Sequence, residues 1–421
     1  MNLTVENISV VEKADITLDS ITVIAGYNGT GKSSISKALY AVLSASCNML
    51  EKIKLERINS IQYRIRKELG KIAYEDDESG LRREWIDSFL MKIAESVKMA
   101  DEKNQKSKIR IEMDKLDAVF GKDTEVKDAF LSLIEDFAQQ VYERPDELYR
   151  KFILNKTITN LFHGQVRNLN NNEMAKISLE DFHSKSCLNM KYVDNKMESE
   201  GNFNFEGHNI FYLEPRHIFD VLSNGKQIQG MDIRCKDLEE KLRVDPRQQE
   251  DYVLEQHEEI EHASNLIDSI LDEVVKGRLI YENDSFLFKE EVNQIPIHIA
   301  NTASGLKTLL VLQRLVKNGA LRRGDVLIID EPEMNQHPKW QVIFAEVLVL
   351  LGKEMNIKIM LNSHSPYFIR ALECKMARYE VLDKGKFYLM QEGSKGRYVA
   401  EDVTKNTEKI YKDLYEPLEE L

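Results

Sequence analysis

The sequence predicts an α/β protein with a mostly parallel sheet that carries helices on both faces, together with a small antiparallel sheet and helical insertions. Two features point to this fold class. A short apolar run at 21–25, ITVIA, reads as a buried strand and leads through a glycine-containing loop into an amphipathic helix. Farther along, the apolar runs VLIID at 326–330 and IKIML at 357–361 alternate with helical segments. Apolar strands that alternate with helices are typical of parallel sheets covered on both faces.

Length and charge limit the classes of protein that remain. The chain of 421 residues is long for one compact core, so we expect a main domain with a large insertion or two lobes. An apolar fraction of 42% suits a globular protein. The net charge of −13 argues against a surface that attracts nucleic acid as a whole, although a local basic patch stays open.

The cysteines and the N-terminal residues indicate the compartment. The four cysteines lie far apart without a C-x-x-C pair, which favours buried thiols in a reducing cytosol over a disulfide framework or a metal site. The first residues contain no apolar core of a signal peptide, and no stretch approaches the length of an apolar membrane span. We therefore expect a cytoplasmic protein with no membrane partner.

Changes in hydrophobic pattern and in charge divide the chain into segments. Residues 1–49 alternate like strands up to the glycine-containing loop, and 50–163 turn to charged, helix-favouring sequence that reads as a helical insertion. Strand character returns in 164–233, and a further helical segment follows in 234–276. The last segment, 277–421, combines short strands, helices and the apolar runs of the main sheet. We expect the first, third and last segments to form one head.

The loop AGYNGTGKSS at 25–34 fits the pattern G-x-x-x-x-G-K-[ST], in which successive backbone N–H groups converge on an anion. Glycine is required there because a Cβ would collide with a phosphate or forbid the turn. The order of strand, loop and helix aims a helix N-terminus at the phosphate, which argues against a chance match. The residues expected to contact phosphate are Asn28, Gly29, Thr30, Gly31, Lys32, Ser33 and Ser34.

Two acidic residues end the apolar run DVLIIDE at 325–331. Hydrolysis of a nucleotide requires a metal carboxylate and a group that activates water. We expect Asp330 to hold Mg²⁺ together with the Ser33 hydroxyl, and Glu331 to orient or deprotonate the attacking water. In isolation these acids would be a polar strand end before the turn at Pro332, but the phosphate loop upstream favours the catalytic interpretation.

Two further stretches extend the candidate site. In NTASGLK, Ser304 and Gly305 open a helix, and we expect a second anion site because serine is a good N-cap and the helix N-terminus presents free N–H groups. In IKIMLNSHSP, His364 follows a strand end, where an imidazole can bond the γ-phosphate and sense its loss. An ordinary polar residue at a strand end is the alternative for His364.

These parts, in this order along the chain, resemble the P-loop NTPase head of ABC-type ATPases. Within that class the sequence is most similar to the branch that contains structural-maintenance-of-chromosomes (SMC) proteins, RecF and the overcoming-lysogenization-defect (OLD) ATPases. The resemblance covers the first forty residues and about 280–400. It is carried by AGYNGTGKSS, NTASGLK, VLIIDEPEMNQHP and NSHSP.

The resemblance implies that ATP is bound between two subunits arranged head to tail. Ser304 and Gly305 of one chain would cap the γ-phosphate of ATP held by the Lys32 loop of the other. Assembly into a dimer or a higher homo-oligomer would then depend on ATP, and hydrolysis would loosen the interface. The residues MNQH at 334–337 occupy the place of the loop that crosses this interface.

Several positions depart from the pattern of the wider class. Leu306 and Lys307 replace the second glycine and the glutamine of the transporter signature LSGGQ, as is usual in the OLD-like branch. His337 stands where transporters carry an aspartate. Two residues are open for the role of the glutamine that contacts Mg²⁺, Gln165 in FHGQV and Glu214 in YLEPR.

Heads of this kind resemble the ATPase components of bacterial anti-phage systems such as PARIS, Septu and retron-associated modules. The stretch after His364 is too short for a Toprim nuclease domain and shows no D-x-D cluster. The resemblance therefore implies an ATP-hydrolysing sensor or regulatory scaffold for a separate effector, such as a Toprim-like or HNH nuclease. The helical insertion would mediate assembly or docking of that effector.

Other functions stay open at this point. A DNA-repair or chromosome-associated ATPase of the RecF or SMC kind would act directly on DNA with a salt-sensitive affinity, but the acidic balance and the short insertion speak against it. A transporter subunit is disfavoured by the signature and by His337. In a non-enzymatic, nucleotide-gated scaffold, Glu331 would serve binding more than turnover.

Overall fold

In the computed structural model the chain divides into two units. The first comprises Met1–Cys47 and Leu154–Leu421, and the second comprises Asn48–Ile153. Part of the insertion expected at 50–163, residues 74–123, lies outside the described residues. The structure describes residues 1–73, 124–168, 173–181, 184–193, 196–202, 205, 209–223, 232–244, 254–271, 274–292 and 295–419.

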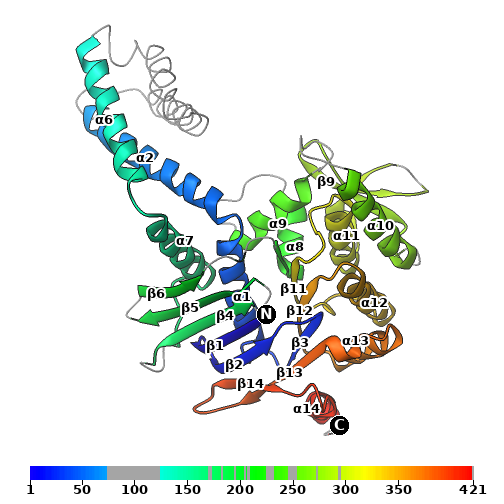
Figure 1. The fold of residues 1–421 in the computed structure, drawn as a ribbon. Coiled ribbons are helices and arrows are strands. Elements are labelled where there is room, and N and C mark those ends of the chain that lie inside the picture. The colour runs from blue at the N-terminus through cyan, green and yellow to red at the C-terminus, as the bar shows by residue number, and fades with distance from the viewer. Residues whose placement is uncertain are drawn as a thin grey trace. The chain divides into compact units, whose positions relative to one another are not determined.

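Strands from both ends of the sequence form one eleven-stranded sheet in the first unit (Figure 1). The strands are β1 (Asn2–Ile8), β2 (Val11–Thr17), β3 (Ile21–Ala25), β4 (Ala175–Asp181), β5 (Ser186–Val193), β6 (Lys196–Asn202), β7 (Ile210–Leu213), β11 (Val326–Asp330), β12 (Lys358–Ser363), β13 (Gly385–Glu392) and β14 (Tyr398–Asp402). Their order is β6-β5-β4-β1-β2-β14-β13-β3-β12-β11-β7.

The sheet has a parallel part and an antiparallel part. From β13 to β7 every neighbouring pair is parallel, whereas β2, β1, β4, β5 and β6 pair antiparallel in turn. β14 joins the parts because it is antiparallel to β13 and parallel to β2. The predicted α/β class is confirmed, and the strands expected near the N-terminus extend the main sheet.

Helices of the first unit pack on the sheet and around it. The segment 164–233, expected to supply strands, also contains a helix, α8. None of the described helices is long and apolar enough to cross a membrane. The helices are α1 (Lys32–Ser46), α8 (Pro215–Ser223), α9 (Ile233–Arg243), α10 (Leu254–Leu271), α11 (Ser304–Lys317), α12 (Pro338–Glu354), α13 (Pro366–Arg378) and α14 (Glu408–Glu419), with short 3₁₀ turns at Ile299–Asn301 and Leu382–Lys384.

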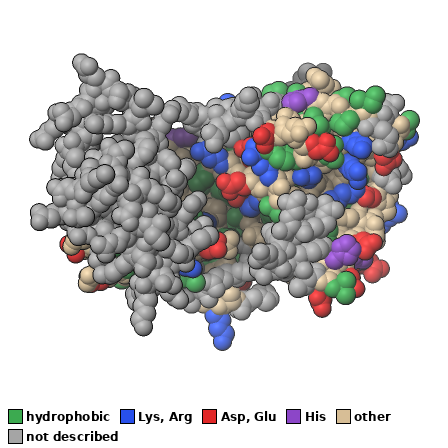
Figure 2. All heavy atoms as spheres, turned by 90° about the horizontal axis from the view of Figure 1, so that it is seen from above, with side chains coloured by type: hydrophobic (Ala, Val, Ile, Leu, Met, Phe, Trp, Pro, Cys, Tyr) green, Lys and Arg blue, Asp and Glu red, His purple; other side chains and the backbone are tan. Residues whose placement is uncertain are grey.

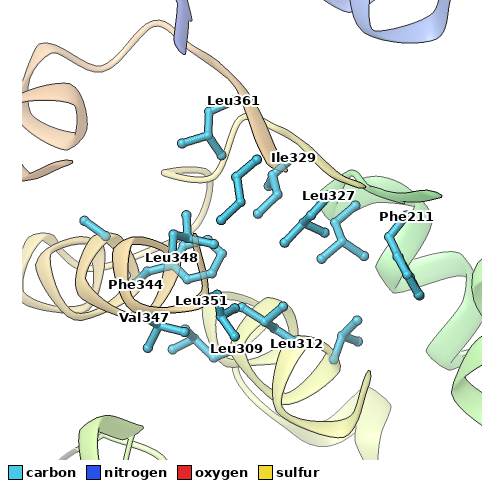
Figure 3. Close-up of a cluster of buried hydrophobic side chains, with 14 of the residues drawn as sticks. Phe211, Leu309, Leu312, Leu327, Ile329, Phe344, Val347, Leu348, Leu351 and Leu361 are labelled. Atoms are coloured by element: carbon cyan, nitrogen blue, oxygen red, sulfur yellow. The ribbon is translucent and has the colours of Figure 1, made fainter. Parts of the chain in front are cut away.

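Both faces of the parallel part are covered, which explains why its strands are apolar at nearly every position. Side chains alternate between the two faces of a strand. Ile329 and Leu361 point to one face, where they lie over the side chains of α11 and α12 (Figure 3). Met360, next to Leu361, points to the other face and receives a contact from the Ser36 hydroxyl of α1.

A separate three-stranded antiparallel sheet follows α10. It consists of β8 (Gly277–Glu282), β9 (Ser285–Glu290) and β10 (Ile297–His298), in the order β10-β9-β8. Asn283 and Asp284 connect β8 to β9 with φ angles of 49° and 56°. Two consecutive left-handed residues make a type I′ turn, whose twist matches that of a hairpin.

The described residues of the second unit are mainly helical. It contains α2 (Met49–Ala73), α6 (Thr124–Tyr142) and the start of α7 (Asp146–Leu161). Arg57 of α2 bonds the Asp146 carboxylate at 2.7 Å, and its guanidinium lies 5.3 Å from the ring centroids of Tyr142 and Tyr149. One arginine thus connects the three helices described in this unit by an ion pair and two cation–π contacts.

Candidate functional site

The carboxyl ends of three neighbouring parallel strands bring the phosphate loop, the acidic pair and His364 to one edge of the sheet. β12 lies between β3 and β11, and its register pairs Ser363 with Ala25 and Asn362 with Asp330. The phosphate loop therefore leaves β3 beside the end of β12, where His364 follows. Open α/β sheets bind ligands at this edge because loops and helix N-termini converge there.

Two glycines determine the path of the phosphate loop. Gly26 and Gly31 have φ angles of 148° and 96°, in the region that side chains disfavour. A Cβ at Gly31 would lie 2.6 Å from Val11 Cγ2, and one at Gly26 would lie 2.9 Å from Met390 Cβ. Helix α1 begins at Lys32, directly after the loop, so the loop closes over a helix N-terminus, which is a favourable position for an anion.

The Lys32 ammonium is folded back onto the loop. Its Nζ donates to the carbonyl oxygens of Gly26 and Tyr27, each at 2.8 Å. Burial lowers the pKa of Lys32, although the carboxylates of Glu331 and Asp330 act in the opposite direction. A buried cation whose hydrogen bonds go to neutral carbonyls gains from an anionic ligand, so this lysine is suited to phosphate.

A cavity of about 320 Å³ lies between the loop and the acidic strand end. Most of the residues expected to contact phosphate line it. Thr30 does not, because it is buried and its hydroxyl donates to the Tyr27 carbonyl at 2.9 Å. The lining residues are Ser9, Val10, Asn28, Gly29, Gly31, Lys32, Ser33, Ser34, Glu331 and Asn362.

Asp330 is buried, and both oxygens of its carboxylate accept hydrogen bonds. The Tyr212 hydroxyl donates to Oδ2 at 2.5 Å, and the Asn362 amide donates to Oδ1. Asn362 Nδ2 also lies 2.7 Å from the Ser36 hydroxyl of α1. The carboxylate is thus fixed in direction before any metal arrives, and Asn362 connects it to the cavity.

Glu331 has a left-handed backbone, with φ of 50°. Its N–H donates to the Asn362 carbonyl at 2.9 Å, which extends the pairing of the two strands by one step. Non-glycine residues in this region are uncommon and concentrate at functional sites. The turn places Glu331 in the wall of the cavity while its neighbour Asp330 stays buried.

Glu333 organises the loop that carries His364. Its Oε1 accepts from the Ser363 hydroxyl and from the His364 N–H, both at 2.9 Å, and from the Ser365 N–H at 3.2 Å. The imidazole Nδ1 of His364 lies 3.2 Å from the same oxygen. The carboxylate therefore holds both the backbone and the ring of His364, whose side chain is 42% exposed.

The signature residues lie away from this cavity in their own chain. Ser304 and Gly305 are not among the residues that line it. The expectation that Ser304 caps its helix is wrong: Ala303 is the N-cap, and Ser304 is the exposed first residue of α11. Ser304 lies one residue after the N-cap position, so its hydroxyl does not cap the helix.

Gly305 packs against the loop that follows the acidic strand. A Cβ there would lie 2.2 Å from the Asn335 carbonyl oxygen, so only glycine fits. His337 ends this loop as the N-cap of α12, where its Nδ1 accepts from the Lys339 N–H at 3.2 Å. The start of α11 and the residues 334–337 are therefore one structural unit.

A second, polar cavity of about 490 Å³ adjoins the loop at Ser33. Glu214 lines it, whereas Gln165 does not, so of the two residues considered for the Mg²⁺-contacting role only Glu214 shares this cavity with Ser33. Burial raises the pKa of Glu214. The other lining residues are Lys37, His163, Arg216, His217, Asp220, Asp232, Arg234 and Cys235.

Arg234 is the central charge of this polar cavity. Its guanidinium bonds Asp232 at 2.9 Å and Glu214 at 3.2 Å, and its side chain is 5% exposed. Burial opposes the ionisation of Asp232, but the hydrogen bonds from Arg234 outweigh it and lower the pKa of Asp232 to about 2. Burial, aided by the positive charge of Arg234, lowers the pKa of His217 to about 4, so its imidazole is neutral at physiological pH.

The residues present suit a Mg²⁺ ion bound chiefly through phosphate. In the part of the chain that the structure describes, no group of three or more His, Cys, Asp or Glu side chains is placed to hold a metal. Mg²⁺ commonly takes one or two protein oxygens and fills its other positions with water and substrate phosphates. The Ser33 hydroxyl and the fixed Asp330 carboxylate match that requirement.

Sequence reasoning missed three polar residues of this site. Asn362 and Glu333 lie inside the quoted stretches NSHSP and VLIIDEPEMNQHP, but nothing in the spacing showed that they bond Asp330 and the His364 loop. Tyr212 lies near the end of the apolar run IFYL. Tyr212 could have been found from its place on the strand next to the one that ends in Asp330 and Glu331. That neighbourhood follows from the strand order, which the sequence does not give.

Known proteins similar to this chain include one family and several solved structures. A family model described as AAA ATPase domain matches residues 1–369. Among solved structures, the chain is similar to the SMC head domain from Thermotoga maritima, at 10% identity and a TM-score of 0.40, over 96% of this chain and 98% of that chain. It is also similar to an Smc head bound to the C-terminal winged-helix domain of ScpA (11% identity, TM-score 0.43, 97% of this chain and 98% of that chain). The recombination mediator RecF with a bound ATP analogue gives 8% identity and a TM-score of 0.39, over 96% of this chain and 97% of that chain. No curated protein matches the chain.

The role of Glu333 predicts a local effect on the His364 loop. Glu333→Ala leaves the N–H groups of His364 and Ser365 without their acceptor, so their amide hydrogens should exchange at least tenfold faster, since each lost bond to a charged group is worth about 1.5–3 kcal/mol. Hydrogen exchange followed by mass spectrometry measures this. Glu258→Ala, on the exposed side of α10, is the control and should leave the exchange of residues 363–366 unchanged. Equal exchange in the two variants would show that Glu333 does not hold this loop.

Proposed function

This chain belongs to the AAA ATPase domain family, and on that premise we propose that it binds ATP with Mg²⁺ at the phosphate loop and hydrolyses it. The observation that carries the proposal is the shared cavity of Lys32, Ser33 and Glu331. It combines a cation, a hydroxyl and a carboxylate at a helix N-terminus. These are the parts that phosphoryl transfer to water requires, because its catalysis consists mainly of positioning and charge stabilisation.

The loop residues that line the cavity have separate roles in binding. The N–H groups of the loop and of the first turn of α1 donate to the phosphates, as the N-terminus of a helix does for any anion. Lys32 exchanges its bonds to the Gly26 and Tyr27 carbonyls for bonds to the β- and γ-phosphates. Ser33 and Asp330 would hold Mg²⁺, which when bound would supply positive charge to neutralise the phosphates and orient the triphosphate.

Glu331 is the residue proposed to orient and deprotonate the attacking water. It lines the cavity, and its left-handed backbone directs it there while Asp330 remains with its buried partners. His364 is proposed to contact the γ-phosphate and to report its loss. Glu333 supports this role because it holds the backbone and the ring of His364 through one oxygen.

We propose that two copies assemble head to tail around ATP. Ser304 and Gly305 do not line the cavity of their own chain, and Ser304 is exposed at the start of α11. A helix N-terminus with an exposed serine can accept the γ-phosphate of ATP held by a second copy. Gly305 allows the loop 334–337 to pack directly on the start of α11, so we expect a displacement of the loop to displace the helix start as well.

For the cellular role, we propose a regulatory scaffold that holds or releases a separate effector, such as a Toprim-like or HNH nuclease in anti-phage defence. The described residues after His364 complete the main sheet and its helices and thus belong to the head. The helical unit Asn48–Ile153 presents exposed apolar side chains, among them Leu55 and Tyr63, which suit a protein partner. Acidic and basic side chains are interspersed over the described part of the face in Figure 2, and a mixed surface attracts DNA less than a basic one. Direct action on DNA is therefore the second candidate function.

Removing the loop cation should abolish nucleotide binding. Lys32→Ala is expected to weaken ATP binding at least about 100-fold, because two charge-assisted hydrogen bonds to phosphate are lost. Isothermal titration with ATP and Mg²⁺ measures the affinity. Lys353→Ala, an exposed lysine of α12, should bind like the parent. Unchanged affinity in Lys32→Ala would place the nucleotide elsewhere.

Neutralising the proposed base should separate binding from turnover. Glu331→Gln is expected to retain ATP affinity, to lose at least about 100-fold in kcat, and to accumulate dimers or larger assemblies with ATP. Phosphate release and light scattering report the two effects, with Glu392→Gln, at the exposed end of the otherwise largely buried β13, as the control. A variant that turns over at the parent rate, or that assembles no better than the parent, would remove Glu331 from this role.

The effector role predicts a partner that depends on the helical unit. Purification of the parent from its native cells with ATP should recover a nuclease, and the double change Leu55→Glu with Tyr63→Glu should reduce recovery at least tenfold while ATP turnover persists. Leu254→Glu, at a residue as exposed as Tyr63 but in the first unit, is the control. Recovery of the chain alone with either ATP or ADP would contradict the role, and turnover stimulated by DNA without any partner would favour direct action on DNA.

A further inference from the structure

We propose that Tyr212 is a positioning residue for the Mg²⁺ carboxylate: its hydroxyl fixes the direction of Asp330. This inference rests on the proposed function, because it concerns the same metal site. Tyr212 lies on β7, beside β11, and is buried. Its hydroxyl donates to Asp330 Oδ2 at 2.5 Å.

This contact holds the second oxygen of the Asp330 carboxylate, so that both oxygens have a donor. Asn362 on β12 donates to Oδ1, while Tyr212 on β7 donates to Oδ2. These two strands are the neighbours of β11 on its opposite sides. Rotation of the Asp330 carboxylate would break one of these two hydrogen bonds, which are strong because the acceptor is charged. The lone pairs that remain for the metal therefore keep one orientation.

The ring of Tyr212 is itself held on two sides. The Arg234 guanidinium lies 4.6 Å from the ring centroid, and the Tyr40 ring of α1 meets it edge-on with centroids 5.6 Å apart and an interplanar angle of 83°. Asp232 and Glu214 fix the guanidinium in turn. Because the Tyr212 ring is held in place, its hydroxyl keeps the Asp330 carboxylate in one orientation, as outer-shell partners do for metal ligands.

Removing only the hydroxyl should therefore weaken the metal site and leave the nucleotide site intact. Tyr212→Phe keeps the ring, the cation–π contact and the contact with Tyr40. We expect the Mg²⁺ concentration that half-saturates ATP binding to rise about tenfold, in the range typical for loss of an outer-shell partner. At saturating Mg²⁺ the affinity for ATP and the turnover should return to those of the parent.

Tyr40→Phe is the matched control. It removes the same atom from the neighbouring tyrosine, whose hydroxyl donates to Asp237 at 3.0 Å and does not contact Asp330. Its Mg²⁺ requirement should equal that of the parent. Isothermal titration with ATP at graded Mg²⁺ measures binding for all three proteins, and thermal unfolding without nucleotide reports on folding.

The outcomes separate this inference from the proposed function. A parent that binds no ATP at any Mg²⁺ concentration would overturn the proposed function itself. If the parent binds and Tyr212→Phe shows the same or a lower Mg²⁺ requirement, or if Tyr40→Phe shifts equally, the positioning role of Tyr212 is overturned alone.

A second measurement requires no variant and covers the case in which Tyr212→Phe does not fold. A crystal structure of the parent with Mg²⁺ and a non-hydrolysable ATP analogue should retain the hydrogen bond between the Tyr212 hydroxyl and Asp330. A hydroxyl that has left the carboxylate in that complex would overturn the inference.

Discussion

The parallel pairing of β12 with β3 on one side and with β11 on the other is the constraint on which the site depends. It sets Ser363 beside Ala25 and Asn362 beside Asp330, so three segments far apart in the sequence end at the same edge. A shift of one residue in either pair would turn the side chains of a whole strand to the opposite face. The register is therefore maintained by every apolar side chain of these strands, not only by the polar groups at their ends.

Burial on both faces gives this register its strength. Side chains of β11 and β12 enter the apolar layer against α11 and α12 shown in Figure 3, while alternate residues meet α1 on the other side. Helix α1 also carries the phosphate loop at its start, and α11 carries Ser304 and Gly305. The same packing that stabilises the sheet thus fixes the positions of both helix N-termini that matter for the proposed chemistry.

The charged groups at this edge differ in how firmly they are held. Asp330 and Glu333 are buried and accept hydrogen bonds from neighbouring strands or from the His364 loop. Lys32 is bound by loop carbonyls, which a phosphate can replace. Glu331 stands in the cavity wall on a left-handed residue. The arrangement fixes the groups proposed to orient the metal and the sensor histidine, and leaves those proposed to exchange partners accessible from the cavity.

The sequence by itself determined the α/β class, the phosphate loop and the acidic strand end, because each is a local pattern: an apolar run of strand length, a glycine spacing, and polar residues that follow a buried strand. Strand order was not local, and so the tertiary structure alone decided that Tyr212 and Asn362 flank Asp330 and that Glu333 holds the His364 loop. It also moved the helix cap from Ser304 to Ala303, a difference of one residue that backbone angles fix and composition does not. Such contacts join residues that are 31 to 118 positions apart, or depend on a single turn of backbone, and only the packing of strands and helices on both faces of the sheet brings them within hydrogen-bond distance.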